Sequence, residues 1–359
     1  MGNKVMIAMS GGVDSSVAAL VLLQQGYSVC GATLSLFSQE DAGICDTATR
    51  TCCSIADVED ARAVAYRLGF LHYVFNFGDH FRRDVMDRFA QGYASGQTPN
   101  PCLDCNRYIK FDRMLARARS LGMDYLATGH YARIRYNEAT GRWQLYKAAD
   151  PTKDQSYVLY TLTQDMLAHT LFPLGDMTKA QVRTLALEHD LINAQKPDSQ
   201  DICFVPNGDY TSFLARTYGL TEQPGNFIDQ EGRILGQHKG IIHYTIGQRK
   251  GLGISAPHPL YVVSKDPGTN TVVLGREEEL YTTRFHVGDC NWISVEKPED
   301  GMIVSVRTRY HQKETPARLY PTETGDILVE TEEKLRAVTP GQAAVFYQGD
   351  AVVGGGTIL

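Results

Sequence analysis

The sequence predicts an α/β protein with a Rossmann-like parallel-sheet domain, then a small mixed domain, then a β-rich C-terminal part. Two observations support this prediction. As far as Gly129, short apolar runs alternate with amphipathic stretches, which is typical of parallel strands joined by covering helices. From about Gly225, short alternating runs separated by turns replace that pattern, which indicates a small β-barrel or sandwich.

The expected elements can be placed along the chain. Strands are expected at residues 5–9, 27–37, 71–77 and 125–129. Helices are expected at 14–25, 54–69, 79–94, directly after Cys105, and at 178–191, with a hairpin around 266–268. Ligands of a parallel sheet bind where the carboxyl ends of its strands meet. Residues 10–15, the loop 98–105 and residues 129–130 are therefore expected to share one crevice.

Composition indicates a soluble globular enzyme. The chain has 359 residues, of which 43% are hydrophobic and 21% charged. No apolar run approaches the roughly 20 residues that span a bilayer, and the N-terminus has no secretory leader. We therefore expect a cytoplasmic protein without a membrane partner. In a reducing compartment, clustered cysteines more often bind metal or perform chemistry than form structural disulfides.

The charge of the chain is uneven. Its formal net charge of −6 disfavours a nucleic-acid partner. Two basic sets oppose that trend, however, and either can contact phosphates; a solvated helix face and a sheet rim are equally consistent with them. The first set is Arg107, Lys110, Arg113, Arg117 and Arg119, and the second is Arg307, Arg309, Lys313 and Arg318.

The segment MSGGVDSS (9–16) joins the first strand to the first helix. Its glycines let backbone N–H groups approach an anion, and the helix N-terminus adds partial positive charge. Asp14 cannot itself bind phosphate, so we expect it to bridge through Mg²⁺. The lysine of a Walker loop is missing, which disfavours ordinary γ-phosphate hydrolysis. This S-G-G-x-D-S pattern resembles that of the pyrophosphate-loop ATPases, which adenylate a carbonyl oxygen with ATP.

Seven of the eight cysteines fall into three groups, and the eighth, Cys203, stands alone in SQDICFVP. Cys30 and Cys290 stand among apolar neighbours and are expected to be buried. Cys102 and Cys105, in TPNPCLDCN, have a C-x-x-C spacing that suits a metal clip, a redox pair or a sulfur-handling site. A zinc or redox insert, or a loop with incidental thiols, would account for the remaining cluster of Cys45, Cys52 and Cys53.

Six segments together resemble one family. In order, MSGGVDSS, TPNPCLDCN, LATGHYAR, KDQSYVLY, SQDICFVP and PGQAAVFY are similar to motifs of the tRNA-specific 2-thiouridylases, and the likeness covers essentially the whole chain. This resemblance implies ATP-dependent 2-thiolation of the wobble uridine of tRNA. The uracil C2 oxygen would be adenylated with release of pyrophosphate, and sulfur attack would then release AMP. It also implies a sulfur-donor protein or persulfide carrier as a partner.

The resemblance assigns domains and residues. It implies a pyrophosphate-loop domain (1–165 and 192–208), a central domain (166–191 and 209–278) and a C-terminal β-barrel (279–359). Cys105 matches the nucleophile and Cys203 the persulfide carrier, while Asn100, Pro101 and Cys102 match the loop that meets the target base. The matching ATP-binding residues are Ala8, Met9, Ser10, Gly11, Gly12, Val13, Asp14, Ser15, Leu34 and Gly129. The matching tRNA contacts are His130, Lys153, Asp154, Gln155, Arg309, Tyr310 and Gln342.

One position departs from a branch of that family, in which aspartate stands where this chain has Cys102. Cys102, Cys105 and Cys203 could therefore hold a [4Fe–4S] cluster with one open iron. The alternative is a persulfide relay between Cys203 and Cys105, with Cys102 as a bystander or resolving thiol. A zinc clip lacks an obvious fourth ligand.

Two other functions compete with thiolation. Another adenylating pyrophosphate-loop enzyme that acts on tRNA, such as a lysidine synthase, would not require both Cys105 and Cys203. A non-catalytic RNA-binding or metal-storage protein would not require S-G-G-x-D-S.

Overall fold

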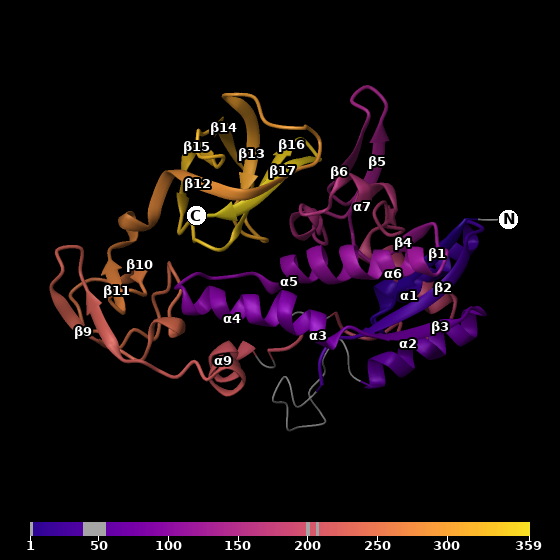
Figure 1. Ribbon diagram of the computed structural model, residues 1–359, viewed down its shortest axis with the longest axis horizontal. Helices are drawn as coiled ribbons and strands as arrows, with labels where there is room; N and C mark the ends of the chain where they lie inside the picture. The colour runs from indigo at the N-terminus through magenta and orange to yellow at the C-terminus, as the bar shows by residue number, and fades with distance from the viewer. Residues whose placement is uncertain (1–2, 39–54, 199–201, 206–207) are drawn as a thin grey trace.

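The computed structural model describes residues 3–38, 55–198, 202–205 and 208–359. In Figure 1 the N-terminal α/β domain lies on the right, the central domain forms the left end, and the C-terminal barrel lies above helices α4 and α5. Cys45, Cys52 and Cys53 fall outside the described residues, as does Ser54 at the expected start of a helix.

The N-terminal domain is built on a five-stranded parallel sheet with the order β3-β2-β1-β4-β7. Val5, Met6 and Ile7 of the central strand β1 are fully buried, as expected where helices cover both faces. The predicted Rossmann-like sheet is thus confirmed. Its strands are β1 (Lys4–Ala8), β2 (Ser28–Ser35), β3 (His72–Asn76), β4 (Tyr125–Ala127) and β7 (Thr170–Leu171).

Helices pack on both faces of this sheet. One apolar cluster joins α1 (Val13–Gln24), α2 (Ile55–Leu68) and α8 (Lys179–Glu188). The other face is covered by two long helical runs. They comprise α3 (Gly78–Phe81), η1 (Arg82–Met86) and α4 (Asp87–Ala94), then α5 (Pro101–Asp104), η2 (Cys105–Met114) and α6 (Leu115–Ser120).

Two of these segments, η1 and η2, are π-helical. In a π-helix each backbone hydrogen bond joins residues that are five positions apart. Such stretches are rare and occur frequently at functional sites. The sequence predicted the helices but not this geometry.

Residues 166–191 belong with the N-terminal sheet in the structure. Strand β7 pairs with β4, and Val182 and Ala186 of α8 enter the same apolar cluster as α1. The resemblance had assigned this stretch to the central domain. We therefore propose to place the domain boundary after it.

The central domain contains a four-stranded sheet with the order β10-β11-β8-β9. Phe227, Val262 and Val272 are fully buried in its own apolar core. The antiparallel pairing of β10 with β11 confirms the predicted hairpin. Its elements are α9 (Tyr210–Tyr218), β8 (Gly225–Ile228), β9 (Ile234–His238), η5 (Ile241–His243), β10 (Tyr261–Asp266), β11 (Thr271–Gly275) and η6 (Glu277–Leu280).

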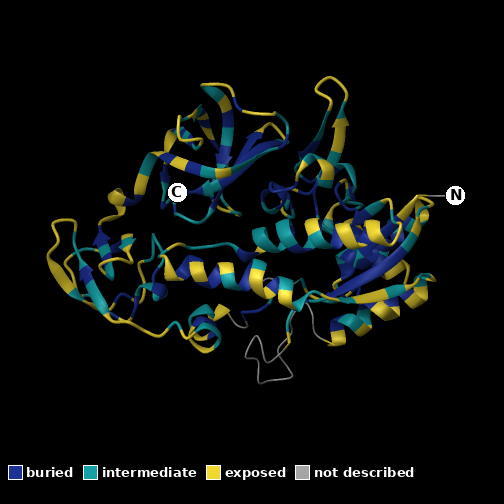
Figure 2. Ribbon diagram, viewed as in Figure 1, coloured by how far each residue is buried: buried dark blue, intermediate teal, exposed yellow. Residues whose placement is uncertain are grey.

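The C-terminal domain is a six-stranded antiparallel barrel, closed by pairing of β12 with β17. Residues along β14 alternate between buried and exposed, as a barrel wall requires, which Figure 2 shows. The predicted barrel is confirmed. Its strands are β12 (Tyr281–Trp292), β13 (Met302–Arg307), β14 (Thr315–Pro321), β15 (Ile327–Arg336), β16 (Ala343–Gln348) and β17 (Ala351–Ile358).

A hairpin of the N-terminal domain extends the barrel sheet. It consists of β5 (Arg133–Asn137) and β6 (Arg142–Tyr146), and Tyr146 pairs with Ala351 of β17. The N-terminal domain and the barrel are therefore joined by backbone pairing as well as side chains. The connecting helices are η3 (Ser156–Leu159) and α7 (Gln164–Ala168). Within the ranges given above, no helix is long and apolar enough to cross a membrane.

Candidate active site

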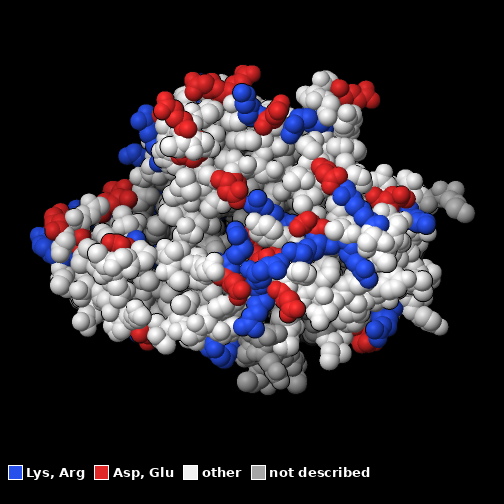
Figure 3. Space-filling view, viewed as in Figure 1, with Lys and Arg blue, Asp and Glu red and all other residues white. Residues whose placement is uncertain are grey.

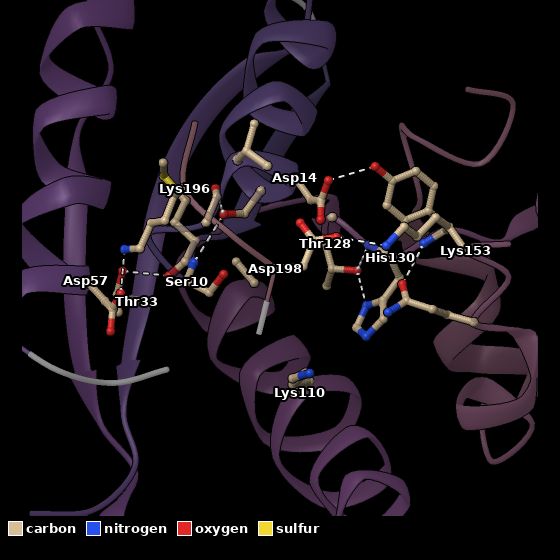
Figure 4. A pocket seen from close by; sticks show the side chains of 18 of the residues that line it. Ser10, Asp14, Thr33, Asp57, Lys110, Thr128, His130, Lys153, Lys196 and Asp198 are labelled. Atoms are coloured by element: carbon tan, nitrogen blue, oxygen red, sulfur yellow. Dashed lines mark hydrogen bonds and ion pairs between the residues drawn. The ribbon is translucent and has the colours of Figure 1, made fainter. Parts of the chain in front are cut away.

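A cavity of about 720 Å³ opens at the carboxyl ends of β1, β2 and β4 (Figure 4). The residues after β1 and β4 line it, so residues 10–15 and 129–130 share the crevice that the sequence predicted. The barrel contributes Tyr310 and His311 to the wall. Predicted ATP-binding residues in the lining are Ala8, Met9, Ser10, Gly12, Val13, Asp14, Ser15, Leu34 and Gly129.

The glycine loop before α1 is tightly packed. Gly11 has a φ of +68°, and a Cβ there would lie 2.4 Å from the carbonyl oxygen of Asp57. Gly12 is the N-cap of α1, and its carbonyl accepts a hydrogen bond of 3.0 Å from Ser15 Oγ. At Gly129 a Cβ would lie 2.8 Å from the Ser15 nitrogen. Only glycine lets these backbones come so close, which holds the start of α1 at the cavity.

Asp14 and Asp198 share one lysine. Lys179 Nζ lies 2.7 and 2.8 Å from the two carboxylate oxygens of Asp14 and 2.8 Å from Asp198 Oδ1. Lys153 Nζ lies 2.8 Å from the other oxygen of Asp198. Burial raises the pKa of Asp198, but hydrogen bonds from Lys153 and Lys179 outweigh burial and bring it to about 2. Asp198 is therefore ionised at neutral pH.

A second lysine connects the loop to α2. Lys196 Nζ lies 2.6 Å from Asp57 Oδ1 and 2.7 Å from Asp60 Oδ2, and donates to the carbonyl of Gly11 at 3.2 Å. Asn193 Nδ2 donates to the same carbonyl at 3.0 Å. The segment 193–198 thus holds the glycine loop in place.

Sequence reasoning missed four of these residues: Lys179, Asn193, Lys196 and Asp198. One signal was present, because Lys196 and Asp198 stand directly before the SQDICFVP motif.

The Asp14 carboxylate does not have the surroundings expected of a magnesium ligand. Both of its oxygens accept hydrogen bonds from Lys179, and Tyr131 Oη also donates to Oδ1, at 2.7 Å. A magnesium ion at Asp14 would have to displace the lysine. As the described residues stand, Lys179 provides the positive charge that the sequence assigned to Mg²⁺.

The wall opposite the loop carries His130 and Lys110. Burial lowers the pKa of His130 well below its ordinary value of 6.5, and the charge of Lys110 lowers it further. His130 is therefore neutral at pH 7, and its Nδ1 lies 2.7 Å from Thr128 Oγ1. A neutral imidazole can donate or accept a hydrogen bond to a base without adding charge.

None of the three candidate sulfur residues is in the lining of this cavity. Cys102 is exposed at the start of α5, where Asn100 Oδ1 accepts a hydrogen bond from its backbone nitrogen. Burial raises the pKa of Tyr310, a cavity residue, to about 12, and the charge of Asp154 adds a smaller effect. Cys105 and Cys203 both pack against one apolar cluster. We expected loop 98–105 to share this crevice, but none of its residues lines the cavity.

These cysteines were also tested as cluster ligands. Among the residues that the structure places, no group of three His, Cys, Asp or Glu side chains is arranged to hold a metal ion. The three thiols thus do not form a ready set of ligands for a [4Fe–4S] cluster. Of the isolated cysteines, Cys30 is buried as expected, whereas Cys290 is only half-buried and packs against the barrel core.

The residues matched to tRNA contacts separate into two groups. His130, Lys153, Gln155 and Tyr310 line the cavity. The other three are engaged in contacts between domains or within the barrel. The Asp154 side chain is 4% exposed and lies 3.1 Å from Arg307 Nη1, Arg309 Nη2 donates to the Ala337 carbonyl at 3.0 Å, and Gln342 donates to the Thr98 carbonyl.

The basic sets are partly neutralised. Figure 3 shows Lys and Arg side chains across the middle of one face, over α3 to α6, with acidic side chains among them. Three of the five basic residues at 107–119 have acidic partners: Arg107 with Asp289 at 2.7 Å, Arg113 with Asp84 at 3.4 Å, and Arg119 with Asp165 at 2.7 Å. Arg117 lies over the Phe75 ring, and Lys110 lines the cavity. Arg307 of the second set joins Asp154 and Glu314.

The fold and the loop together define a class. A parallel sheet, a glycine loop at the end of β1 and the start of α1 at the cavity make a nucleotide-binding α/β domain, here followed by two β-rich domains. Family profiles agree with this division. They are described as a tRNA methyl transferase HUP domain (residues 3–207), a tRNA methyl transferase PRC-barrel domain (211–276) and an aminomethyltransferase β-barrel domain (282–358).

Relatives over the full length specify the family. The chain is 51% identical to a tRNA-specific 2-thiouridylase MnmA of Acetivibrio thermocellus, over 99% of both chains. It is 50% identical to one of Carboxydothermus hydrogenoformans, covering 99% of this chain and 97% of the relative. A third relative, from Lachnoclostridium phytofermentans, is 49% identical over 99% of both chains. The chain therefore belongs to the tRNA-specific 2-thiouridylase family.

Proposed function

We propose that this protein is a tRNA-uridine 2-sulfurtransferase that uses ATP to replace the C2 oxygen of the wobble uridine with sulfur. One observation carries the proposal. Cys105 and Cys203, far apart in the sequence, pack against the same apolar cluster, to which Leu34 and Leu36 of the cavity wall also belong. Another adenylating enzyme of this fold would need the loop but not the two cysteines.

The first step is adenylation of the uracil. The glycine loop and the start of α1 direct N–H groups towards the phosphates of ATP. The C2 oxygen attacks the α-phosphorus, the bond to the pyrophosphate breaks, and pyrophosphate leaves. Neutral His130 and Tyr310 lie where the base would meet the cavity wall. Bases that undergo such chemistry are taken out of the stack and held against aromatic side chains.

The second step transfers sulfur. The terminal sulfur of a persulfide on Cys203 attacks C2, and the C2 oxygen leaves with AMP. The Cys105 thiolate then attacks Cys203 Sγ. The bond between Sγ and the transferred sulfur breaks, its electron pair completes the thiocarbonyl, and a Cys105–Cys203 disulfide forms. A dithiol reductant must restore both thiols before a donor supplies the next sulfane sulfur.

Three further parts of the proposal concern partners and surroundings. The substrate is a tRNA with a thiolatable wobble uridine, and a sulfur-donor protein or persulfide carrier loads Cys203. Mg²⁺ would accompany ATP, with Asp14 and Asp198 as its nearest carboxylates once Lys179 moves. The site of action is the cytoplasm, where the thiols stay reduced.

Turnover with tRNA tests the proposal. Purified protein is incubated with ATP, Mg²⁺, sulfide or a persulfide donor, and unmodified tRNA transcripts. Nucleoside mass spectrometry should detect 2-thiouridine at the wobble position, with one AMP released for each. A transcript with cytidine at that position is the control. AMP release without 2-thiouridine would instead favour another adenylating enzyme.

A further inference from the structure

Lys110 lies in the cavity wall opposite the glycine loop. It belongs to η2, and Figure 4 shows it rising from that helix towards the space between Asp198 and His130. The sequence placed it in a basic set of residues 107–119 without a separate role. In the structure it is the member of that set that lines the cavity.

The other lysines at this cavity are neutralised. Lys153 pairs with Asp198 at 2.8 Å, and Lys196 pairs with Asp57 and Asp60 at 2.6 and 2.7 Å. Lys179, behind the loop, is shared by two carboxylates. Over the described part of the chain, no hydrogen bond or ion pair is formed by Lys110. An ammonium kept without a partner in a part-buried site is costly unless an anion joins it.

The charge of Lys110 matches a need of the phosphate loop. The loop has no lysine where a Walker loop would place one to reach the β- and γ-phosphates. Its acidic neighbours Asp14 and Asp198 already take up the charges of Lys153 and Lys179. A polyphosphate therefore meets a single uncompensated side-chain cation among the cavity residues that the structure describes.

The π-helical geometry of η2 connects this lysine to the sulfur chemistry. Hydrogen bonds five residues apart bring residues i and i+5 close to one face of such a helix. Cys105 is the first residue of η2, and Lys110 follows it by five. An anion held at Lys110 would therefore also fix the helix that begins at the proposed nucleophile.

We propose that Lys110 binds the pyrophosphate portion of ATP, in place of the lysine that the loop lacks. This inference rests on the proposed function for ATP as the substrate. Lys110 then stabilises the negative charge that develops as pyrophosphate leaves.

Calorimetric titration without tRNA tests this assignment. Lys110→Met, Lys110→Arg and wild type are each titrated with ATP, inorganic pyrophosphate and AMP. Lys297→Met, at an exposed barrel lysine, is the matched control for loss of one positive charge. Loss of a charged hydrogen bond should weaken ATP and pyrophosphate by about tenfold to a hundredfold, and AMP by less than about threefold. Lys110→Arg should recover most of the affinity.

A parallel titration with tRNA and no ATP separates the two sources of phosphate. The affinity for tRNA and its salt dependence should be the same for Lys110→Met and Lys297→Met. A variant that loses tRNA affinity and keeps ATP affinity would assign Lys110 to an RNA phosphate and overturn the inference, as would unchanged binding of both. Equal thermal midpoints exclude misfolding. Because binding needs no sulfur transfer, the inference can hold even where thiolation fails.

Discussion

The phosphate side and the sulfur side of the site are built differently. On the phosphate side, Asp14 and Asp198 are paired with lysines, and two glycines allow the backbones to touch. On the sulfur side, Cys102 is exposed, and Cys105 and Cys203 are half-buried. The charged side chains of the proposed ATP site are thus already in place before ATP binds. The thiols, in contrast, must be reached by a sulfur donor and a reductant.

The largest effect is expected on the phosphate side, from Lys179→Met. The Lys179 side chain is 12% exposed, and its removal leaves the Asp14 carboxylate without a cation, whereas Asp198 keeps Lys153 and Arg183. The free energy of unfolding should fall by about 3 kcal/mol. AMP formation should fall by at least about a hundredfold, because Asp14 loses its position. Urea unfolding and AMP release measure the two effects.

Lys179→Arg serves as the control for this variant. An arginine can bridge the same two carboxylates, so most of the stability should return. If Lys179→Met were as stable and as active as wild type, the phosphate side would not depend on this network.

An intermediate effect is expected from pH, through Asp198. Its pKa is lowered from 3.8 to about 2, so its contribution to stability is present above about pH 4 and is lost as the pH falls towards 2. That contribution is about 2 kcal/mol. The stability difference between wild type and Asp198→Asn should therefore shrink as the pH falls from about 6 to about 2. A difference that is constant over this range would contradict the assigned role of Asp198.

The smallest effect is expected on the sulfur side, from Cys102→Ser. Cys102 is exposed, so its replacement should change the free energy of unfolding by less than about 0.5 kcal/mol. If the relay uses Cys105 and Cys203, thiolation should stay within about threefold of wild type. Anaerobic thiolation with a persulfide donor and a dithiol reductant, together with bound iron, is measured for Cys102→Ser and Cys203→Ser. If both variants lost iron and thiolation to the same extent, the result would favour a cluster held by the three cysteines over the persulfide relay.

Local patterns predicted the parts of the fold that depend on neighbouring residues. The apolar run ending at Ala8 and the glycines after it were enough to predict β1, the loop and α1. Alternation after Gly225 was enough to predict the β-rich domains. The hairpin that extends the barrel was not predictable, because Tyr146 pairs with Ala351, 205 residues further on.

The sequence predicted the site residues that lie in motifs. It did not predict their ion-pair partners, which are distant in the sequence. Asp14 was identified from its motif, but its cation, Lys179, stands on a helix 165 residues away. Asp154 stands in a motif matched to tRNA contact, yet its carboxylate is paired with Arg307 of the barrel. Ion pairs of this kind depend on how distant segments and domains pack together. The hydrophobic periodicity of a single segment carries no information about that packing.

A single-turnover experiment tests the sulfur relay most directly. Protein carrying persulfide on Cys203 is mixed with ATP and unmodified tRNA, without donor or reductant. We predict about one 2-thiouridine for each persulfide consumed, with a Cys105–Cys203 disulfide appearing in peptide mass spectra at the same rate. Cys105→Ser should form little free 2-thiouridine and should instead accumulate tRNA joined to Cys203 through a disulfide. Continued 2-thiouridine formation by Cys203→Ser, with no disulfide in the wild type, would contradict the account.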